Sequence, residues 1–402
     1  MMKKTLCELF AWVWWFRVWL EANDSWWETV WANQREPSRT AQYAFDCYAE
    51  NFWWKQEKYS NVDIAKVNKK NIPDHNLLVW WFPCQDYSVA RTWAKWIQWK
   101  KWVLWRQIRD ILIAKKPSFV LLENVDRLLK SPWNQRWRDF WIILASFNEL
   151  WYSVEWRVIN AADYWRVQRR RRTFIFAYKN TTKYGKSLKG KTFEDLLHKD
   201  WFFINQFWVE ELPLAKRNTE LEYNDLADIS DKFRFDFWNS WVIRNGKIYT
   251  EEIVPHYEWP KMNLWDIIQN SVDEKYKIKQ DISKWKYLKW PKRIIRKQWT
   301  PQEYVFSEWG IAFPDPLDRP ARTMLTSEWS LNRSTHVVQD KNWDYRILTP
   351  IETERINWFP DDWTSKWWMP EKFRYFCMGN ALCVPMITKM WKLLDDIFEK
   401  ED

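Results

Sequence analysis

Apolar residues follow two alternating patterns over the first 180 residues. Short apolar runs predict β-strands at residues 5–11, 76–81, 118–125, 152–160 and 172–178. Between these runs, apolar residues recur at spacings of three and four, which predicts helices at residues 37–52, 103–116 and 137–150. Alternating strands and helices are typical of a mostly parallel sheet with helices on both faces. The sequence therefore predicts an α/β fold for this region.

The pattern loosens after residue 180. Residues 180–191 (NTTKYGKSLKGK) are polar and contain glycine, which is typical of a linker. Residues 191–340 mix charged and aromatic side chains without clear alternation, so a smaller, irregular α+β domain is expected there. The remaining residues become regular again and end in an expected helix at 385–400. We expect a first domain at 1–180, a second at 181–340, and a C-terminal segment at 341–402 that returns to the first.

Composition restricts the function only weakly. The chain carries 63 Lys and Arg against 53 Asp and Glu, a formal net charge of +10, which suits a polyanionic partner but also an ordinary solvated surface. Five cysteines without a CxxC pair argue against a disulfide framework and favour a reducing, cytoplasmic location. No uncharged apolar run reaches the roughly 18 residues of a membrane span. The N-terminus imitates a signal peptide, but Glu8 and Arg17 interrupt the pattern, so a buried first strand is expected.

Tryptophan and glycine occur in unusual numbers, 39 and 5 residues respectively. Glycine normally makes up about 7% of a chain, because turns need backbone angles that other residues adopt only with strain. Here tryptophan occupies turn-like segments such as ELWYS (149–153) and INWFPDD (356–362). We hypothesise that most tryptophans stand where the native chain has glycine. This would follow if the gene used a genetic code in which UGA specifies glycine and was translated with a code in which UGA specifies tryptophan. The rival hypothesis, an aromatic binding surface, predicts tryptophans spaced at two or 3.6 residues on one face.

Two segments suggest a ligand site and a nucleophile. Residues 9–20 (LFAWVWWFRVWL) become a glycine-rich loop after the first strand if their tryptophans are glycines; alternatively, this is an ordinary strand–helix turn. Cys84 follows an apolar strand and is preceded by Pro83, a placement suited to a nucleophile. The alternative is a buried, inert thiol, which is the usual fate of a cysteine and the interpretation we give to Cys7 and the three others.

Two further segments carry charges next to apolar strands. Glu123 closes a strongly apolar strand, where a carboxylate is costly unless it has a partner or a function; the alternative is a helix cap or loop acid. Four arginines, 169–172, lead into the strand at 172–178. Strand alternation would place Arg170 and Arg172 on one face, where they could hold an anion or a base edge. The alternative is a solvated run of charges.

These segments, in this order, resemble the motifs of DNA cytosine C5-methyltransferases. The residues RILTPIETERINWFPDDW (346–363) and MGNALCVP (378–385) complete the set, and the resemblance runs from residue 5 to about residue 395 with a weaker match in the middle. Where that family has glycine, this chain has tryptophan at 12, 14, 15, 19, 80, 81, 165 and 358, whereas Gly379 is retained. Trp105 and Trp156 fall where no glycine is required.

The resemblance implies that the first domain is a Rossmann-like, S-adenosylmethionine-dependent methyltransferase domain. By similarity, the cofactor pocket would comprise Phe10, Ala11, Trp12, Trp14, Trp15, Gln34, Asp63, Ile64, Pro83, Leu104 and Asn380. Gln34 stands where the family usually has an acid that holds the ribose hydroxyls. Its amide could still accept a hydrogen bond, but it carries no charge. No metal is expected, because the histidines have no ligand-like spacing with cysteines.

The resemblance also implies a mechanism. The Cys84 thiolate would add to C6 of cytosine, Glu123 would bond the N3 side, and Arg172, supported by Arg170, would position the base. The base would have to be flipped out of the duplex. DNA contacts are expected from Gln85, Ser88, Arg322, Thr323 and Arg333. The alternative for Arg322, Thr323 and Arg333, each taken by itself, is an ordinary polar residue on the surface.

The expected protein is thus a DNA (cytosine-5-)-methyltransferase, acting on double-stranded DNA in a restriction–modification system. The second domain would select the DNA sequence, a restriction endonuclease of the same system is a candidate partner, and a cytoplasmic monomer without membrane contact is expected. Two alternatives stay open at this point. One is a tRNA cytosine-5 methyltransferase. The other, if the tryptophans are real, is a catalytically inactive DNA-binding relative.

Overall fold

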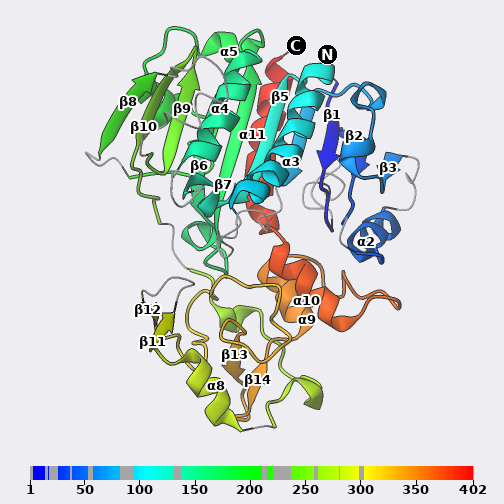
Figure 1. Cartoon of the computed structure of the whole chain (residues 1–402), viewed down its shortest axis with the longest axis vertical. Coiled ribbons are helices and arrows are strands. Elements are labelled where there is room, and N and C mark those ends of the chain that lie inside the picture. Colours follow the sequence, from blue (N-terminus) through cyan, green and yellow to red (C-terminus); the bar gives the residue numbers. More distant parts are fainter. Residues whose placement is uncertain are drawn as a thin grey trace. The chain divides into compact units, whose positions relative to one another are not determined.

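One sheet of ten strands forms the core of the first of two units (Figure 1). This computed structural model describes residues 3–13, 17, 26–36, 39–52, 58–81, 94–130, 137–210, 215–220, 237–257, 261–279, 281–297 and 303–401. The first unit comprises residues 1–160, 171–257 and 384–402, and the second comprises 161–170 and 258–383. No helix in the described part of the chain is long and apolar enough to cross a membrane.

The strands of the first unit lie in the order β3-β2-β1-β4-β5-β7-β6-β9-β10-β8. Their bounds are β1 (Thr5–Leu9), β2 (Glu28–Asn33), β3 (Tyr59–Ser60), β4 (Leu77–Trp81), β5 (Phe119–Val125), β6 (Tyr152–Asn160), β7 (Arg171–Lys179), β8 (Lys216–Glu220), β9 (Ser240–Arg244) and β10 (Lys247–Glu251). The pairs from β3 to β5 are parallel, and those from β5 to β8 are antiparallel. All five predicted strands are present, as β1, β4, β5, β6 and β7. Those in the parallel part are apolar because both of their faces are covered.

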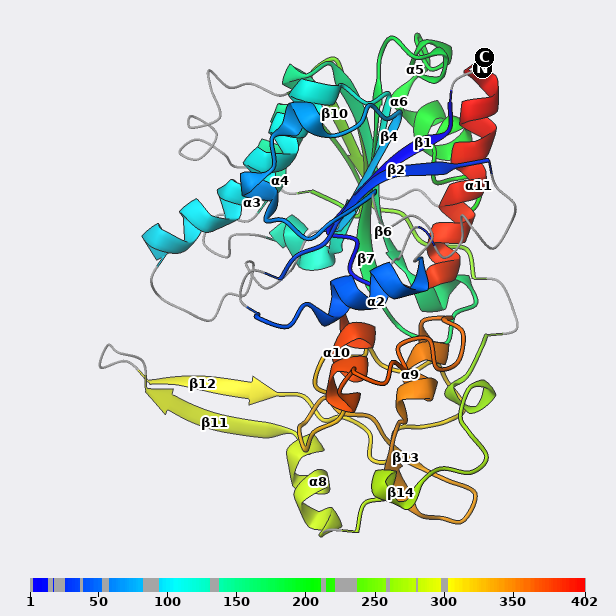
Figure 2. The same cartoon turned by 90° about the vertical axis from the view of Figure 1, so that its right-hand side faces the viewer.

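Helices cover both faces of this sheet. They are α2 (Tyr43–Asn51), α3 (Ala94–Lys115), α4 (Arg138–Glu149), α5 (Lys183–Ser187), α6 (Phe193–Asp195) and α11 (Val384–Lys400). Figure 2 shows α3 and α4 on one face and α11 on the other. The apolar stripe of α11 packs on the sheet, where the ring of Phe398 lies 5.0 Å from that of Phe119. The four predicted helices are confirmed as α2, α3, α4 and α11.

The second unit is irregular and of mixed α+β character. Its helices are α8 (Ile282–Lys289), α9 (Pro350–Ile356) and α10 (Glu371–Asn380). Its two small sheets are antiparallel pairs, β11 (Lys292–Lys297) with β12 (Glu303–Glu308) and β13 (Val337–Gln339) with β14 (Tyr345–Ile347).

The units are bounded differently from the ranges that the sequence pattern suggested. Residues 180–191, expected as a linker, contain α5, and the N–H groups of Lys183 and Tyr184 donate to the Glu401 carboxylate at 2.9 and 2.7 Å. The next strands, β8 to β10, extend the sheet of the first unit, and residues 341–383 belong to the second unit. Charged and polar residues in the edge strand β8 (KRNTE) conceal the strand pattern there.

Left-handed backbone in this structure is concentrated at tryptophan. Ten described residues other than glycine have a positive φ, and six of them are tryptophan, at positions 12, 137, 151, 165, 343 and 358. Bulky side chains rarely adopt such angles, whereas glycine adopts them readily. Three of the six, at 12, 165 and 358, are positions where the resembling family has glycine. This distribution supports the hypothesis of native glycine.

One of these tryptophans completes the end of α9. Trp358, with φ of 66°, donates its N–H to the carbonyl of Arg355 at 2.9 Å, and the next N–H, of Phe359, donates to Glu354 at 3.0 Å. These two hydrogen bonds form the Schellman motif, whose left-handed residue is usually glycine.

Another lies in the turn between β13 and β14. Trp343, with φ of 67°, donates its N–H to Asp340 at 3.1 Å, and Asp340 donates to Asp344 at 3.0 Å. A turn followed by one left-handed residue is a common three-residue hairpin loop, and glycine is favoured at that residue. Trp105, in contrast, donates its indole N–H to Ser146 Oγ at 3.1 Å inside the core, as a genuine tryptophan would.

Candidate active site and cofactor pocket

The carboxyl ends of the parallel strands meet at one edge of the sheet. Leu9 of β1 pairs with Asn33 of β2 and with Trp80 of β4, and Trp81 of β4 pairs with Glu123 of β5. Loops that leave this edge of an open α/β sheet commonly form its binding site. Among the described predicted residues of the first unit, Phe10 and Gln34 directly follow β1 and β2, and Glu123 lies near the end of β5.

The loop after β1 is held against the end of β2. Ala11 N–H donates to the carbonyl of Asn33 at 3.0 Å, and Trp12 N–H donates to Gln34 Oε1 at 2.9 Å. Phe10 and Trp12 both have left-handed φ, 54° and 51°. The buried Gln34 side chain therefore fixes the loop, and its amide nitrogen is left as the group that can donate to a ligand.

The segment after β3 joins the same edge. Asn33 Nδ2 donates to the carbonyls of Ser60 and Val62 at 3.1 and 2.9 Å, and Gln34 N–H also donates to Ser60. Asp63 then caps a short helical turn by accepting from Ala65 N–H at 2.9 Å. The structure thus brings together three of the predicted cofactor segments, around Trp12, Gln34 and Asp63 with the buried Ile64.

Two indoles lie at this edge as the sequence is written. The rings of Trp12 and Trp81 are 6.0 Å apart, and both residues are buried. The polar groups of Gln34 and Asp63 lie at the same edge, where the cofactor pocket is predicted. Glycine at positions 12 and 81 would open space there and let backbone approach a ligand.

Glu123 forms a buried ion pair. Its side chain is fully buried at the end of β5, and its Oε1 lies 2.8 Å from Nε of Arg172, which is itself largely buried. A carboxylate in such a position is costly unless a cation balances it. The structure therefore brings together two of the predicted catalytic residues, Glu123 and Arg172, next to the strand end that leads toward Cys84.

Arg170 has other partners. The strand β7 begins at Arg171, so the expected alternation of Arg170 and Arg172 within one strand is wrong. The Arg170 guanidinium is buried in the second unit and donates to the carbonyls of Met324 and Gly379 at 3.2 and 3.0 Å. These bonds join a loop to the end of α10. The supporting catalytic role of Arg170 stays a prediction.

The remaining predicted residues are placed as follows. Leu104 of α3 packs against the hydrophobic core of the first unit, and Asn380 is the last residue of α10 in the second unit. Outside the described residues lie Trp14, Trp15, Pro83, Cys84, Gln85 and Ser88. The four other cysteines are buried, as expected, and burial raises the pKa of the Cys383 thiol to about 12, which makes it a poor nucleophile.

Comparison with known proteins decides the family. The sequence profile of the C-5 cytosine-specific DNA methylase family matches residues 5–395. The chain belongs to this family. The prediction of a DNA cytosine-5 methyltransferase is thereby confirmed, and members of this family depend in general on S-adenosylmethionine.

Individual relatives agree with this methyltransferase assignment. The chain is 47% identical over 404 residues to the type II methyltransferase M.Sau3AI of Staphylococcus aureus, covering 99% of this chain and 97% of that protein. It is 31% identical over 221 residues to M.HhaI of Haemophilus parahaemolyticus, covering 54% and 63%. Among solved structures, the Entamoeba histolytica methyltransferase EhMeth matches with a TM-score of 0.60 at 15% identity, covering 99% of both chains. The S. pombe Dnmt2 methyltransferase matches with a TM-score of 0.58 at 15% identity, covering 98% of this chain and 99% of that one. These likenesses confirm the predicted α/β methyltransferase fold.

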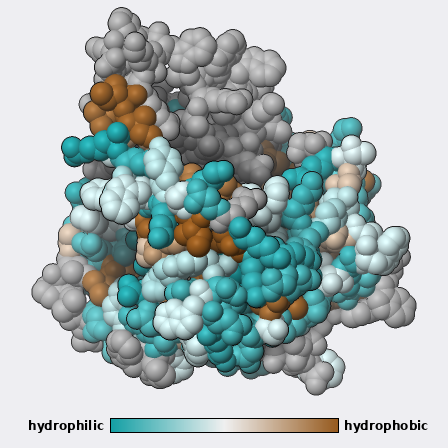
Figure 3. Space-filling model, turned by 90° about the horizontal axis from the view of Figure 1, so that it is seen from below, coloured by the Kyte–Doolittle hydropathy of each residue, from teal (hydrophilic) through white to brown (hydrophobic). Residues whose placement is uncertain are grey.

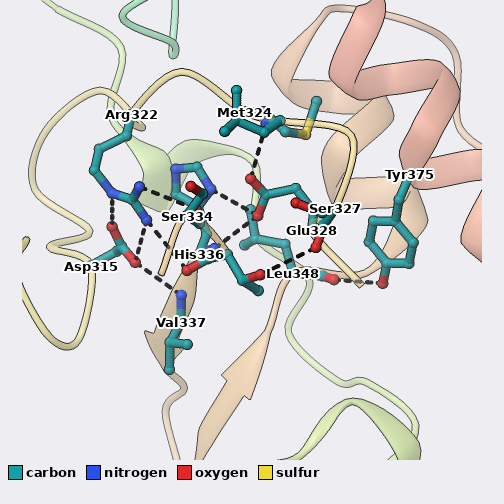
Figure 4. Close-up of polar contacts among 12 residues, drawn as sticks. Asp315, Arg322, Met324, Ser327, Glu328, Ser334, His336, Val337, Leu348 and Tyr375 are labelled. Atoms are coloured by element: carbon teal, nitrogen blue, oxygen red, sulfur yellow. Dashed lines mark hydrogen bonds and ion pairs between the residues drawn. The ribbon is translucent and has the colours of Figure 1, made fainter. Parts of the chain in front are cut away.

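Arg322, a predicted DNA-contacting residue of the methyltransferase, has partners within the second unit (Figure 4). Arg322 donates from Nε and Nη2 to the Asp315 carboxylate at 2.6 and 3.2 Å, and from Nη1 to the carbonyl of Ser334. Lys289 adds a second cation to Asp315 at 3.0 Å. Burial alone would raise the pKa of Asp315, but His336, Arg322 and Lys289 together lower it to about 2.

Two other predicted contacts also have intramolecular partners. Arg333 donates to the carbonyl of Leu288 at 2.7 Å, and the Thr323 hydroxyl donates to the carbonyl of Arg169 at 2.5 Å. In the structure these side chains stabilise the second unit. Their role in DNA binding stays a prediction.

Asn33 is a site residue that the sequence pattern missed. It is buried and connects the first loop to the segment around Asp63 through three hydrogen bonds. The signal was present, since residues 28–33 (ETVWAN) end a short strand with a polar residue in the position where strands of this type carry ligand-binding groups.

Proposed function

We propose that this methyltransferase is the modification enzyme of a type II restriction–modification system. It methylates C5 of a cytosine in a specific sequence of double-stranded DNA, with S-adenosylmethionine as the methyl donor. The identity of 47% to M.Sau3AI over nearly the whole length of both chains supports this role. The structural observation that carries the chemistry is the buried pair of Glu123 and Arg172 at the ligand-binding edge of the sheet.

Cys84 is proposed as the nucleophile. It follows Trp81, the strand partner of Glu123, by three residues, which span at most about 11 Å of chain. Cytosine C5 is a weak nucleophile, and addition of the Cys84 thiolate to C6 raises the electron density at C5. After methylation, loss of the C5 proton returns an electron pair to the ring, the bond between sulfur and C6 breaks, and the thiolate is regenerated.

Glu123 is proposed to bond the N3 side of the same base. A carboxyl group there stabilises the charge that develops on the ring as Cys84 adds. Arg172 acts on Glu123 as a positioning residue, because its Nε holds one carboxylate oxygen at 2.8 Å. These groups can reach the base only when it has left the duplex stack.

The cofactor is proposed to lie at the loops around Phe10, Gln34 and Asp63. When bound, S-adenosylmethionine supplies an activated methyl group. Gln34 would donate from its amide to a ribose hydroxyl, and the free oxygen of Asp63 would accept from the adenine amine. Glycine in place of Trp12 and Trp81 provides the room this arrangement needs. Pro83, Leu104 and Asn380 are assigned to the same pocket by family resemblance.

The role implies partners and a location. A cognate restriction endonuclease is proposed as the companion activity, and the methyltransferase is proposed to act as a monomer in the cytoplasm. Gln85 and Ser88, beside the nucleophile, are proposed to contact DNA.

The test is methyl transfer from labelled S-adenosylmethionine to duplex DNA and to tRNA, with bisulfite sequencing of the duplex. We expect methylation of one short sequence in the duplex and none of tRNA. Methylation of tRNA alone would replace the proposed substrate. The protein with tryptophans as written and a variant with glycine at 12, 14, 15, 80 and 81 should be compared, and we expect cofactor binding only by the glycine variant. DNA binding by both proteins without any transfer would indicate the inactive relative.

A further inference from the structure

Arg17 is a charged side chain enclosed within the first unit. It is fully buried, whereas hydrophilic side chains dominate the described part of the molecular face that Figure 3 draws. Removing a guanidinium from water is costly unless groups of the protein take the place of the water around it. The surroundings of Arg17 therefore indicate what this buried charge is used for.

Three aromatic rings surround the guanidinium of Arg17. Its central carbon lies 4.1 Å from the centre of the Phe52 ring, 5.1 Å from that of Tyr59 and 5.9 Å from that of Tyr48. Tyr48 belongs to α2, Phe52 follows directly after this helix, and Tyr59 is the first residue of β3, which lies beside α2 in Figure 1. The face of an aromatic ring attracts a cation, so the three rings replace part of the lost hydration.

Hydrogen bonds complete this cluster. Arg17 Nη1 donates to the Tyr59 hydroxyl, which in turn donates to the carbonyl of Phe52 at 2.8 Å. The Tyr48 hydroxyl donates to Oε2 of the buried Glu8 at 3.0 Å. Burial and the charge of Glu8 raise the pKa of Tyr48, so its hydroxyl keeps the proton that it donates. The Arg17 cluster, formed by Glu8, Arg17, Tyr48, Phe52 and Tyr59, thus balances a buried cation with a buried carboxylate.

The Arg17 cluster holds both ends of the loop at which the cofactor is proposed to bind. Glu8, in β1, comes two residues before Phe10, and Arg17 comes five residues after Trp12. The loop therefore begins and ends at side chains of the same buried cluster. Fixing both ends in this way reduces the number of conformations that the loop can adopt.

The cluster is also continuous with the two other segments of the proposed cofactor site. Tyr59 is followed in β3 by Ser60, whose carbonyl accepts from Asn33 Nδ2 and from the N–H of Gln34, both at 3.1 Å. Asp63 follows three residues later. The segments that carry Gln34 and Asp63 are thus attached to the strand that binds the guanidinium.

We propose that Arg17 is a positioning residue for the methyl donor. From the Arg17 cluster it holds the loop after β1 in the conformation that binds S-adenosylmethionine, and it acts through the loop and not by contact with the cofactor. The proposal rests on the proposed function, in which this loop binds the cofactor. A ligand that meets a loop already in its bound conformation pays less ordering entropy. Arg17 therefore contributes to affinity for the cofactor and not to the chemical step.

The test uses the full-length protein with glycine at positions 12, 14, 15, 80 and 81, for which cofactor binding is expected. Arg17→Met removes the charge and the hydrogen bond but keeps an unbranched chain, and it should raise the Kd for S-adenosylmethionine, measured by calorimetry, by about 10- to 100-fold. Tyr59→Phe removes one hydroxyl and should raise this Kd about fivefold. Arg17→Lys keeps a cation against the rings and should recover part of the affinity. In all three variants kcat at saturating cofactor should change by no more than about twofold.

Arg157→Met is the matched control. Arg157 of β6 is buried to 1% exposure, donates to the carbonyl of Phe207 and lies outside the segments proposed to bind the cofactor. Both arginine variants should lower the free energy of unfolding, but only Arg17→Met should raise the Kd for S-adenosylmethionine. A second readout needs no cofactor. The amides of residues 11 and 12, which donate to Asn33 and Gln34, should exchange faster in Arg17→Met than in Arg157→Met.

Equal affinity for S-adenosylmethionine in the Arg17 and Arg157 variants would refute the proposal. A lower kcat at saturating cofactor with an unchanged Kd would also refute it, because Arg17 would then act in the chemical step. If Arg17→Met does not fold, Arg17→Lys and Tyr59→Phe decide the question by the same comparison. Failure of the parent protein to bind S-adenosylmethionine would overturn the proposed cofactor site itself, which is a distinct outcome.

Discussion

The left-handed backbone at Trp343 gives a direct prediction about glycine. Any side chain at φ of 67° places its Cβ against the following carbonyl oxygen, which costs about 1–2 kcal/mol. Glycine removes this cost. Relative to alanine, however, it lowers stability by about 0.4–1 kcal/mol, because its unfolded chain has more conformational entropy. Trp343→Gly should therefore be more stable than Trp343→Ala, although glycine is normally the less stable of the two. Trp343 is 78% exposed, so little packing is lost in either variant.

Trp367 provides the matched control, because it is 96% exposed and its φ is not positive. There, alanine should be more stable than glycine by about 0.4–1 kcal/mol. The difference between glycine and alanine should thus change by about 1–2 kcal/mol between the two positions. Native-state hydrogen exchange would report the free energy of opening at both positions, from the amides of β13 and β14 for Trp343 and from those of α10 for Trp367. The same ranking of glycine and alanine at both positions would refute the reasoning.

Three further predictions concern charged groups. The Asp315 carboxylate has a pKa of about 2 against an ordinary 3.8, so it stabilises the fold by about 2 kcal/mol above pH 4. This stabilisation is lost as the pH falls to 2. In acid unfolding, Asp315→Asn should not show this loss of stability. Burial raises the pKa of Glu155 to about 8, so the free energy of unfolding declines as the pH rises from about 4.5 to 8. Glu155→Gln should remove this decline, which urea unfolding at pH 8 should measure as at least about 1 kcal/mol. Glu123→Gln should lower kcat about 100-fold with unchanged DNA binding; a decrease below tenfold would contradict its assigned role.

The parallel part of the sheet could be predicted because its strands are buried on both faces. Such strands read as continuous apolar runs, which is why β1, β4 and β5 were predicted with small errors at their ends. The strands β8 to β10, at one end of the sheet, were missed, although β9 and β10 are joined at Asn245 and Gly246, both with positive φ. Asn-Gly between short apolar strands is a strong hairpin signal, and it should have extended the first unit to residue 257.

The site was predicted only in part, for a physical reason. Glu123 could be identified because an acid at the end of an apolar strand demands an explanation, but its partner Arg172 could be paired with it only through strand register. Arg322 and Arg333 look like free cations in the sequence. Their partners, the Asp315 carboxylate and the Leu288 carbonyl, are fixed by tertiary packing that local patterns do not encode.

Covalent capture of the target base tests the proposed chemistry most directly. A duplex with 5-fluorocytosine at the methylated position cannot lose a proton from C5, so the bond between Cys84 and C6 should persist. With S-adenosylmethionine present, we expect a complex that survives denaturation, with the modified base attached to the peptide that contains Cys84, and no such complex from Cys84→Ser. A complex formed equally well by Cys84→Ser, or none formed by an enzyme that methylates ordinary duplex DNA, would contradict the account.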